Sequence, residues 1–397
     1  MNHVQLLLIA KYIHRKQRDS STAVFREFES SEVKTETDVL DQLMDILQND
    51  ISGSTTRRKY QVFVTGGVGP GVTSSLFQTV FDQDYTLQTA NPMFDVTFGL
   101  SVSSSLITAS YTDATTGKSY YPSQSVMMRE KTDIYKLFAQ TLLGDAASEF
   151  QLTSGSTTIT VREPLFICFK RLIMRDRIKR ETFGIRLMQT ASLVSGAGTG
   201  AKIFTDVGAS ANKELSYGGQ VSTVVDSGNT TYPVGLLYTD RGVLVLDTQR
   251  AFYSGSMTGT IDAVNAAGTV AFSGLLNQFL VSASIDDILD HMCSVRFSNS
   301  ANTAIVFQNE TIINSTLFFC KFDADEFNYS SNPSYIDANN IIVVIDPGQE
   351  EAQRAFSFIT SVGGYDVHDN LLWVAKLSRP ILKDSQRSFV IRTRIDY

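Results

Sequence analysis

The sequence predicts a mainly β protein, built of β-sandwich-like or barrel-like modules with a few short helices, α+β overall and multi-domain. Ser and Thr together make up about a fifth of the chain, and 25 Phe and 15 Tyr accompany them, a mixture that favours strands and turns over helices. Short alternating segments recur at roughly 8–12-residue spacing between Gly and Asn turns, which is typical of sandwiches and barrels. Charged residues are only 19% of the chain, which argues against disorder or a coiled coil.

The length of 397 residues indicates more than one domain. Changes in the periodicity of apolar residues suggest where the boundaries fall. The predicted parts are an N-terminal helical arm over 1–56, a β-rich domain with one helix over 57–165, a β-rich middle domain over 166–300 and a C-terminal β module over 301–397.

In the first half, the apolar residues between Thr37 and Leu47 recur at helical spacing behind a capping pair, so we expect a short amphipathic helix there. Another helix is expected after Thr132 or Asp133, because Ile134, Leu137, Phe138 and Leu142 recur at helical spacing and Gly144 ends the run. Alternating residues predict strands over 60–65, 95–102, 105–111 and 154–161.

In the second half, residues 190–211 are rich in Gly, Ser and Ala and predict a long exposed loop. Ser284 is the expected N-cap of a short helix ending near His291. The remaining segments predict strands, with 356–365 and 371–377 forming a hairpin: 222–225, 234–238, 242–246, 311–322, 340–345, 356–365, 371–377 and 389–395.

Bulk properties argue against several classes of protein. The net charge is −7 and the pI about 5.2, so nucleic acid is not the expected main partner. No apolar run approaches the about 18 residues of a membrane span, and the N-terminal apolar run is followed by its basic residues, unlike a signal peptide. Cys168, Cys293 and Cys320 are far apart and odd in number, so we expect reduced thiols and no disulfide or zinc site.

No motif predicts catalysis, a cofactor or a small-molecule ligand. The loop Gly66–Thr73 has the spacing of a P-loop, but Val72 replaces the lysine that would contact the phosphates. The glycines at 196, 198 and 200 have the wrong spacing for a dinucleotide loop. Asp323, Asp325 and Glu326 lack the other ligands of a calcium loop, so a turn is expected. We therefore expect no enzyme activity, no cofactor and no metal.

The strongest charge feature is a basic segment between Lys170 and Arg180, interleaved with Leu172, Ile173, Met174 and Ile178. Three interpretations are open: a solvated face whose apolar residues turn inward, a surface that binds an acidic groove of a neighbouring protein, and a nucleic-acid contact. The candidate interaction residues are Lys170, Arg171, Arg175, Arg177, Lys179 and Arg180.

The C-terminal part resembles a known group. The strings FNYSSNPSY, FITSVGGYDVHDNLLWVAKLSRPILKD and IRTRIDY, within residues 311–397, resemble the C-terminal module of virion structural proteins from contractile-tailed bacteriophages. Residues 166–250 resemble the middle of similar proteins less closely. Gly364 departs from the pattern, which has an apolar residue before the Tyr-Asp pair, and the hairpin edge is therefore expected to differ.

The resemblance implies a virion structural protein, made in the host cytoplasm and built into the tail or baseplate, most plainly as a wedge subunit. Its partners would be other tail proteins and copies of itself in a symmetric assembly, without membrane contact. Exposed strand edges would serve as joints. The alternatives are a neck, other tail or capsid-associated protein, and a peripheral receptor- or glycan-binding β module.

Overall fold

The computed structural model contains two compact units, each of which is described separately. Unit 1 comprises residues 1–39 and 312–397, and unit 2 comprises residues 40–311. The structure describes residues 7–9, 26–27, 30–62, 74–108, 111–112, 119–120, 126–190, 199–211, 214–252, 261–264, 270–274, 279–281, 283–297, 302–328, 335–339, 341–343, 345–349, 351–354, 356–365 and 370–397.

The fold is mainly β with short helices, as the sequence predicts. The two units differ, however, from the four consecutive segments expected above. Both ends of the chain contribute strands to unit 1, and β1 pairs with β22 across more than 350 positions of sequence. Division of the sequence into consecutive segments could not show this pairing, because it joins residues from opposite ends of the chain.

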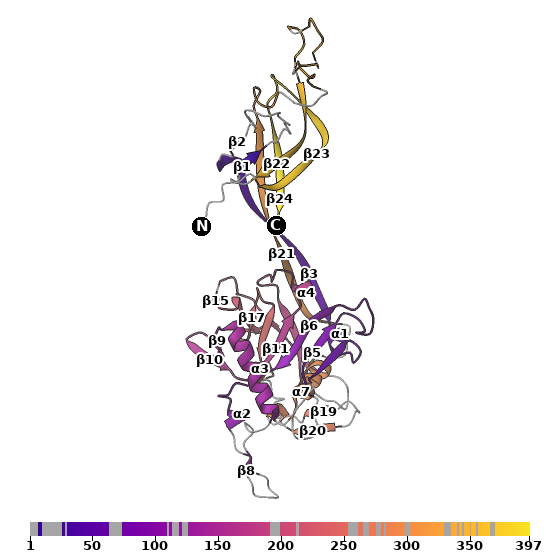
Figure 1. The fold of residues 1–397 in the computed structure, drawn as a ribbon. Helices are drawn as coiled ribbons and strands as arrows, with labels where there is room; N and C mark the ends of the chain where they lie inside the picture. Colours follow the sequence, from indigo (N-terminus) through magenta and orange to yellow (C-terminus); the bar gives the residue numbers. More distant parts are fainter. Residues whose placement is uncertain are drawn as a thin grey trace. The chain divides into compact units, whose positions relative to one another are not determined.

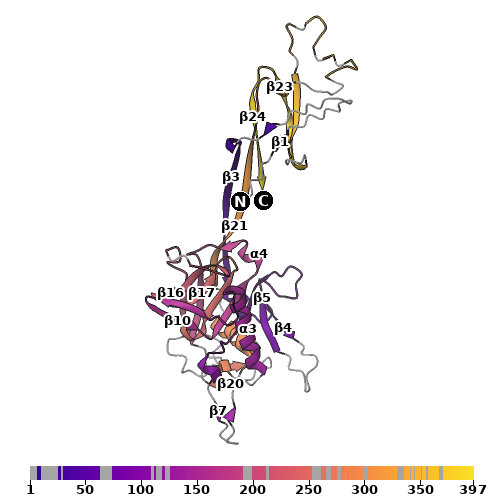
Figure 2. The same ribbon diagram turned by 60° about the vertical axis from the view of Figure 1, so that its left-hand side comes forward.

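The main body of unit 2 is a run of nine antiparallel strands in the order β13-β14-β16-β17-β18-β11-β6-β5-β4. Strands β5 and β4 form one end of this run (Figure 2). Their bounds are β4 Arg57–Val62, β5 Ser74–Phe81, β6 Pro92–Phe98, β11 Pro164–Phe169, β13 Gly184–Thr190, β14 Thr199–Thr205, β16 Gly219–Asp226, β17 Asn229–Tyr238 and β18 Val243–Asp247.

Short strands and helices complete unit 2. The strands are β7 Tyr111–Thr112, β8 Ser119–Tyr120, β9 Phe150–Ser154, β10 Thr157–Val161, β12 Arg177–Ile178, β15 Glu214–Ser216, β19 Ile261–Val264 and β20 Val270–Gly274. The helices are α1 Gln48–Ser52, α2 Ser105–Thr108, α3 Val126–Leu142, α4 Arg171–Met174, α5 Thr248–Ala251, α7 Ile285–His291 and the π-helical turn η4 Met292–Arg296.

The central strands of unit 2 are buried on both faces. In β11, Phe166 contributes to a cluster with Tyr135, Ala139 and Leu142 of α3, which lies across the sheet in Figure 1. Its neighbour Ile167 contributes to the larger cluster on the opposite face. Successive residues of a strand point to opposite faces, and the unbroken apolar run of β11 therefore supplies two cores.

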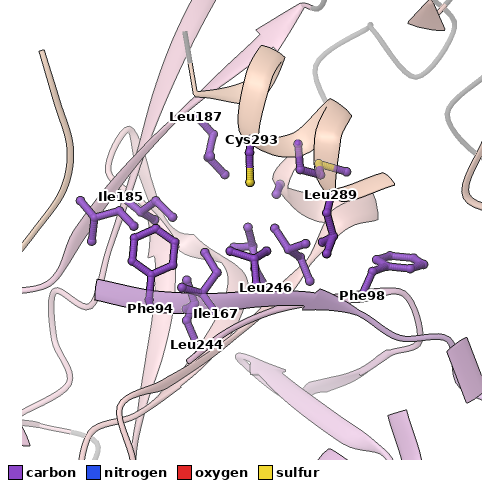
Figure 3. Close-up of a cluster of buried hydrophobic side chains, with 14 of the residues drawn as sticks. Phe94, Phe98, Ile167, Ile185, Leu187, Leu244, Leu246, Leu289 and Cys293 are labelled. Atoms are coloured by element: carbon purple, nitrogen blue, oxygen red, sulfur yellow. The ribbon is translucent and has the colours of Figure 1, made fainter. Parts of the chain in front are cut away.

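Helix α7 and the turn η4 cover the second face. Leu289 and Cys293 project from them toward Phe94, Ile167 and Leu246 of the sheet (Figure 3). The predicted cap is confirmed, because the Ser284 hydroxyl accepts a hydrogen bond from the Asp287 backbone N–H at 3.1 Å. Unit 2 therefore has a helix–sheet–helix arrangement.

Unit 1 contains the short strands β1 Leu7–Ile9 and β2 Arg26–Glu27, the 3₁₀ turn η1 Ser30–Glu32, and the strands β22 Phe356–Tyr365, β23 Leu371–Asp384 and β24 Phe389–Asp396. One sheet has the order β2-β1-β22-β23, and β24 pairs with Ser315–Phe322 of β21. The core consists of Phe318, Cys320, Phe322, Ile359, Val362 and Ile391. The predicted hairpin and the predicted C-terminal strand are both confirmed.

Two long strands, β3 Val33–Leu47 and β21 Thr303–Phe322, each contain a boundary between the units and pair with one another. The helix predicted between Thr37 and Leu47 is therefore wrong. Ile46 is buried in the core of unit 2, whereas Leu43 is 63% exposed. Backbone hydrogen bonds to a distant strand outweigh the local helical pattern.

Other predictions were partly wrong. Residues 105–108 form α2, not a strand, and 199–205 form β14 within the predicted loop. Residues 341–343 make only an isolated bridge between Ile336 and Ile342. The predicted helix before Gly144 is confirmed but begins earlier, at Val126. The loop 66–73, most of the hairpin turn 366–370 and the first part of the loop 190–211 lie outside the described residues.

Gly364 has a clear packing role. A Cβ atom at this position would lie 2.2 Å from Nε1 of Trp373, whose ring contacts Phe318 with centroids 5.1 Å apart. The two residues are register partners in β22 and β23, so their side chains share a face. Glycine replaces the expected apolar residue at position 364, and the indole of Trp373 therefore packs directly against the backbone of β22.

We predict that Gly364→Val displaces the indole, because no side chain fits between it and the strand. Unit 1 should lose about 1–3 kcal/mol of stability, and fluorescence of the single tryptophan should shift to longer wavelength. Gly228→Ala is the control, since its nearest neighbour atom would be 3.5 Å from the new Cβ. An unchanged spectrum for Gly364→Val would contradict this packing.

Two carboxyl groups are buried where β18 leads into α5. Asp247 is 3% exposed and accepts a hydrogen bond from the Gln249 backbone N–H at 2.9 Å. Burial, reinforced by the charge of nearby Glu163, raises the pKa of Asp247 from 3.8 to about 7. The folded protein therefore holds this proton between about pH 4 and pH 7, where the unfolded chain has released it.

Stability of unit 2 should consequently fall as the pH rises from about 4 to about 7, with Asp247 contributing on the order of 4 kcal/mol. Asp247→Asn should flatten this dependence, because the amide keeps the cap without titrating. Urea unfolding followed by circular dichroism at pH 4.5 and 7.5 measures the difference. Asp133→Asn, at an exposed position, is the control. An equal slope in wild type and Asp247→Asn would contradict the assignment.

Candidate interaction surfaces

The basic segment begins after β11 and includes α4 and β12. Lys170 precedes α4, and the backbone N–H groups of Ile173 and Met174 donate to its carbonyl. Arg177 and Ile178 form β12, which pairs with Asn309 and Glu310 of β21. The structure thus places the six candidate residues on one short stretch of unit 2.

Most of these cations have partners within the chain. Lys170 contacts Asp95 at 2.5 Å and Arg171 contacts Asp176 at 2.8 Å. The remaining ion pairs are Arg177 with Glu310 and Lys179 with Asp41. The bond to Asp41 raises the pKa of Lys179. Their charges are therefore largely balanced within unit 2.

Arg180 and Arg175 differ from the other four. The Arg180 guanidinium donates to the Ala209 carbonyl at 3.1 Å. The Arg175 side chain is exposed and forms no ion pair within the described residues. Of the six candidates, Arg175 is therefore the cation most available to a neighbour.

The apolar residues between the cations are mostly core residues. Ile173, Met174 and Ile178 are buried in the main cluster, and only Leu172 is exposed, at 50%. Three of the four therefore turn inward, as the interpretation of a solvated face expects, and only Leu172 could contribute to an interface. What remains accessible is a small surface of Arg171, Leu172 and Arg175.

Strand β23 is an edge strand of unit 1. It pairs with β22 and, within the described residues, with no other strand. Its exposed apolar residues are Leu371, Leu372 and Val374, at 54%, 51% and 57%. Exposed, apolar strand edges readily pair with another chain, so this edge is a candidate joint.

Strand β3 is a second edge. It pairs with β21 and, as far as the described residues go, has no strand on its other side. Leu40 and Leu43 are more than half exposed, and Asp38, Asp41 and Asp45 lie among them. Because the sequence pattern predicted an amphipathic helix here, this strand edge was not found from the sequence.

Burial shifts the pKa values of two cysteines and one histidine. Burial raises the pKa of the Cys168 thiol to about 12 and that of Cys293 to about 11, so both are neutral and unreactive. No group of His, Cys, Asp and Glu within the described part of the chain could hold a metal ion. His291 is fully buried beside Arg296, and both burial and this charge lower its pKa.

A polar network that joins α7 to β4 and β5 was not found from the sequence. Arg57 contacts Asp290 at 3.2 Å, and Lys59 contacts Asp286 at 2.9 Å and Asp290 at 2.5 Å. Gln78 donates to both carboxylates. The residues on β4 and β5 are more than 200 positions away from those on α7, and no local sequence pattern connects the two groups. Their internal pairing indicates a structural role.

Comparisons with known proteins found no match to this chain. No protein-family model, no curated protein and no solved structure matches the chain. Among the described residues, none of the helices has both the length and the apolar character needed to cross a bilayer.

Arg175 carries backbone strain. Its φ of 59° and ψ of −123° fall in a region that favours glycine. We predict that Arg175→Gly raises the melting temperature of unit 2, since glycine relieves about 1–2 kcal/mol of strain. Arg171→Gly, inside α4, should instead destabilise the protein slightly. A lower melting temperature for Arg175→Gly would show that the arginine side chain itself stabilises the turn.

Proposed function

We propose that the chain is a virion structural protein of a tailed bacteriophage, a baseplate wedge subunit that assembles with neighbouring tail proteins. The observation that carries the proposal is the C-terminal resemblance, located in residues 311–397. The described part of this stretch forms β21, β22, β23 and β24, with a compact apolar core and an exposed edge at β23.

The character of the surface supports an assembly role. Interfaces that hold subunits together combine exposed apolar residues with strand edges that can be extended. Unit 1 offers the edge of β23, and unit 2 offers the surface of Arg171, Leu172 and Arg175. A structural subunit of this kind acts by holding its neighbours in place and by transmitting conformational change between them.

The proposal is tested by measuring the mass of the purified chain alone and after co-expression with the genes adjacent to its own. We expect a larger complex of fixed stoichiometry only in the second case. Labelled antibody should then locate the chain in the baseplate of intact particles. A purified chain that forms a stable trimer by itself, with antibody label at the periphery of the tail, would favour a receptor-binding module instead. Label on the neck or capsid would overturn the baseplate assignment.

The surface of Arg171, Leu172 and Arg175 allows a sharper test of the basic segment. Arg175→Glu reverses an exposed charge without breaking an internal pair, whereas Arg177→Glu would also remove the partner of buried Glu310. Arg175→Glu should reduce incorporation into particles by about tenfold if an acidic neighbour binds there. Lys136→Glu, at an exposed position on α3, is the matched control. Equal incorporation of both variants would remove the segment from the interface.

A further inference from the structure

Two of the exposed strand edges, those of β3 and β23, carry opposite charge. Strand β3, of 15 residues, contains four carboxylates and one lysine. Strand β23, of 14 residues, contains three basic residues, of which Lys376 and Arg379 are exposed and Lys383 is buried; its one carboxylate is its last residue, Asp384. Both edges also expose apolar side chains: Val39, Leu40, Leu43 and Leu47 on β3, and Leu371, Leu372 and Val374 on β23. The charge of each edge is therefore complementary to the charge of the other edge, and not to that of a second copy of the same edge.

Charge on an edge strand decides which partner it accepts. Like charges directly opposite one another destabilise a strand pair, so β23 is unfavourable against a second β23, and β3 against a second β3. Opposite charges favour the mixed pair and steer the approach. Charge complementarity thus identifies one occupant for each edge, namely the other edge on a second copy of the chain.

We propose that the β23 edge of one copy pairs with the β3 edge of another copy, forming a head-to-tail contact. Backbone hydrogen bonds along the strands and burial of the exposed leucines and valines would supply the affinity. The charged residues would supply the choice of partner. Because the contact joins two different strands, β23 and β3, it is heterologous, and repeated contacts build a ring or an open chain of copies.

The regular part of β23 is its first half. Residues Trp373 to Lys376 pair one for one with Gly364 to Ser361 of β22. A bulge at Leu372 precedes this run, and a larger irregularity separates Lys376 from Ile381. Pro380 lies in this irregular stretch and cannot donate a hydrogen bond. The pairing segment is therefore centred on the run from Trp373 to Lys376.

Two residues carry the charge recognition most directly. Lys376 and Asp45 are both exposed, and neither forms an ion pair within the part of the chain that the structure describes. The other three carboxylates of β3 form ion pairs: Glu36 with Lys34, Asp38 with Arg394 and Asp41 with Lys179. Lys376 and Asp45 are the positions at which charge can be reversed without breaking an internal pair.

The test uses the full-length chain and measures its mass against concentration by light scattering and sedimentation. We expect wild type to self-associate, and Lys376→Glu and Asp45→Lys each to weaken self-association by about tenfold or more. Mixing the two variants should restore association, because the altered edges are then complementary. The controls Lys136→Glu and Asp133→Lys lie at exposed positions of α3 and should behave as wild type.

Each other outcome overturns the proposal. A wild-type chain that remains monomeric at high concentration would exclude the contact. Loss in Lys376→Glu with full association of Asp45→Lys would indicate that β23 pairs with itself. Failure of the mixture to associate would show that charge complementarity is not the basis of the contact. Circular dichroism and melting confirm folding, and Lys376→Ala with Asp45→Ala replaces any variant that melts early.

This inference deepens the proposed function by naming the surfaces through which copies would bind one another. It rests on the proposed function only for the biological role of that contact. The two can fail separately. A chain that self-associates through these edges but never enters a phage tail would overturn the proposed function alone. A chain that enters the baseplate as single copies would overturn the head-to-tail contact alone.

Discussion

The structure of unit 2 depends on a few central strands that are apolar on both faces. In β11 and β18, neighbouring residues such as Phe166 and Ile167 enter different cores, one beneath α3 and one beneath α7. A strand that is apolar on both faces is stable in water only if both faces are covered. Each fully buried phenylalanine or leucine stabilises this arrangement by about 1.5–3 kcal/mol. The helices are therefore required by the sheet, although they are short.

Unit 1 is built by strands from both ends of the chain. Leu7 to Ile9 pair with β22, and β24 pairs with the later half of β21. Its core is small, so individual contacts such as Trp373 over Gly364 have a large share in it. The small core and the long β23 edge leave apolar residues exposed. In an assembly, such residues would be the natural points of contact.

The distribution of charge separates internal structure from surface. The basic segment is the most conspicuous charge run in the sequence, yet four of its six cations form ion pairs within the chain. By contrast, Asp45 on β3 and Lys376 on β23 are exposed and form no ion pair within the described residues. A run of like charge in a sequence therefore does not by itself define a binding surface. The partners that neutralise it, such as Asp95 and Glu310, lie far away along the chain.

The sequence by itself determined the mainly β fold, the helix ending before Gly144, the Ser284 cap, the C-terminal hairpin and the final strand. These elements depend on local periodicity and capping, which neighbouring residues specify. Tertiary structure decided the rest. The pattern over 37–47 predicts a helix, but pairing with β21 makes it a strand, because long-range hydrogen bonds and burial of Ile46 outweigh local propensity. Tertiary contacts also decided which of the six candidate cations form ion pairs among the described residues, since a charge is neutralised by whatever the fold brings beside it.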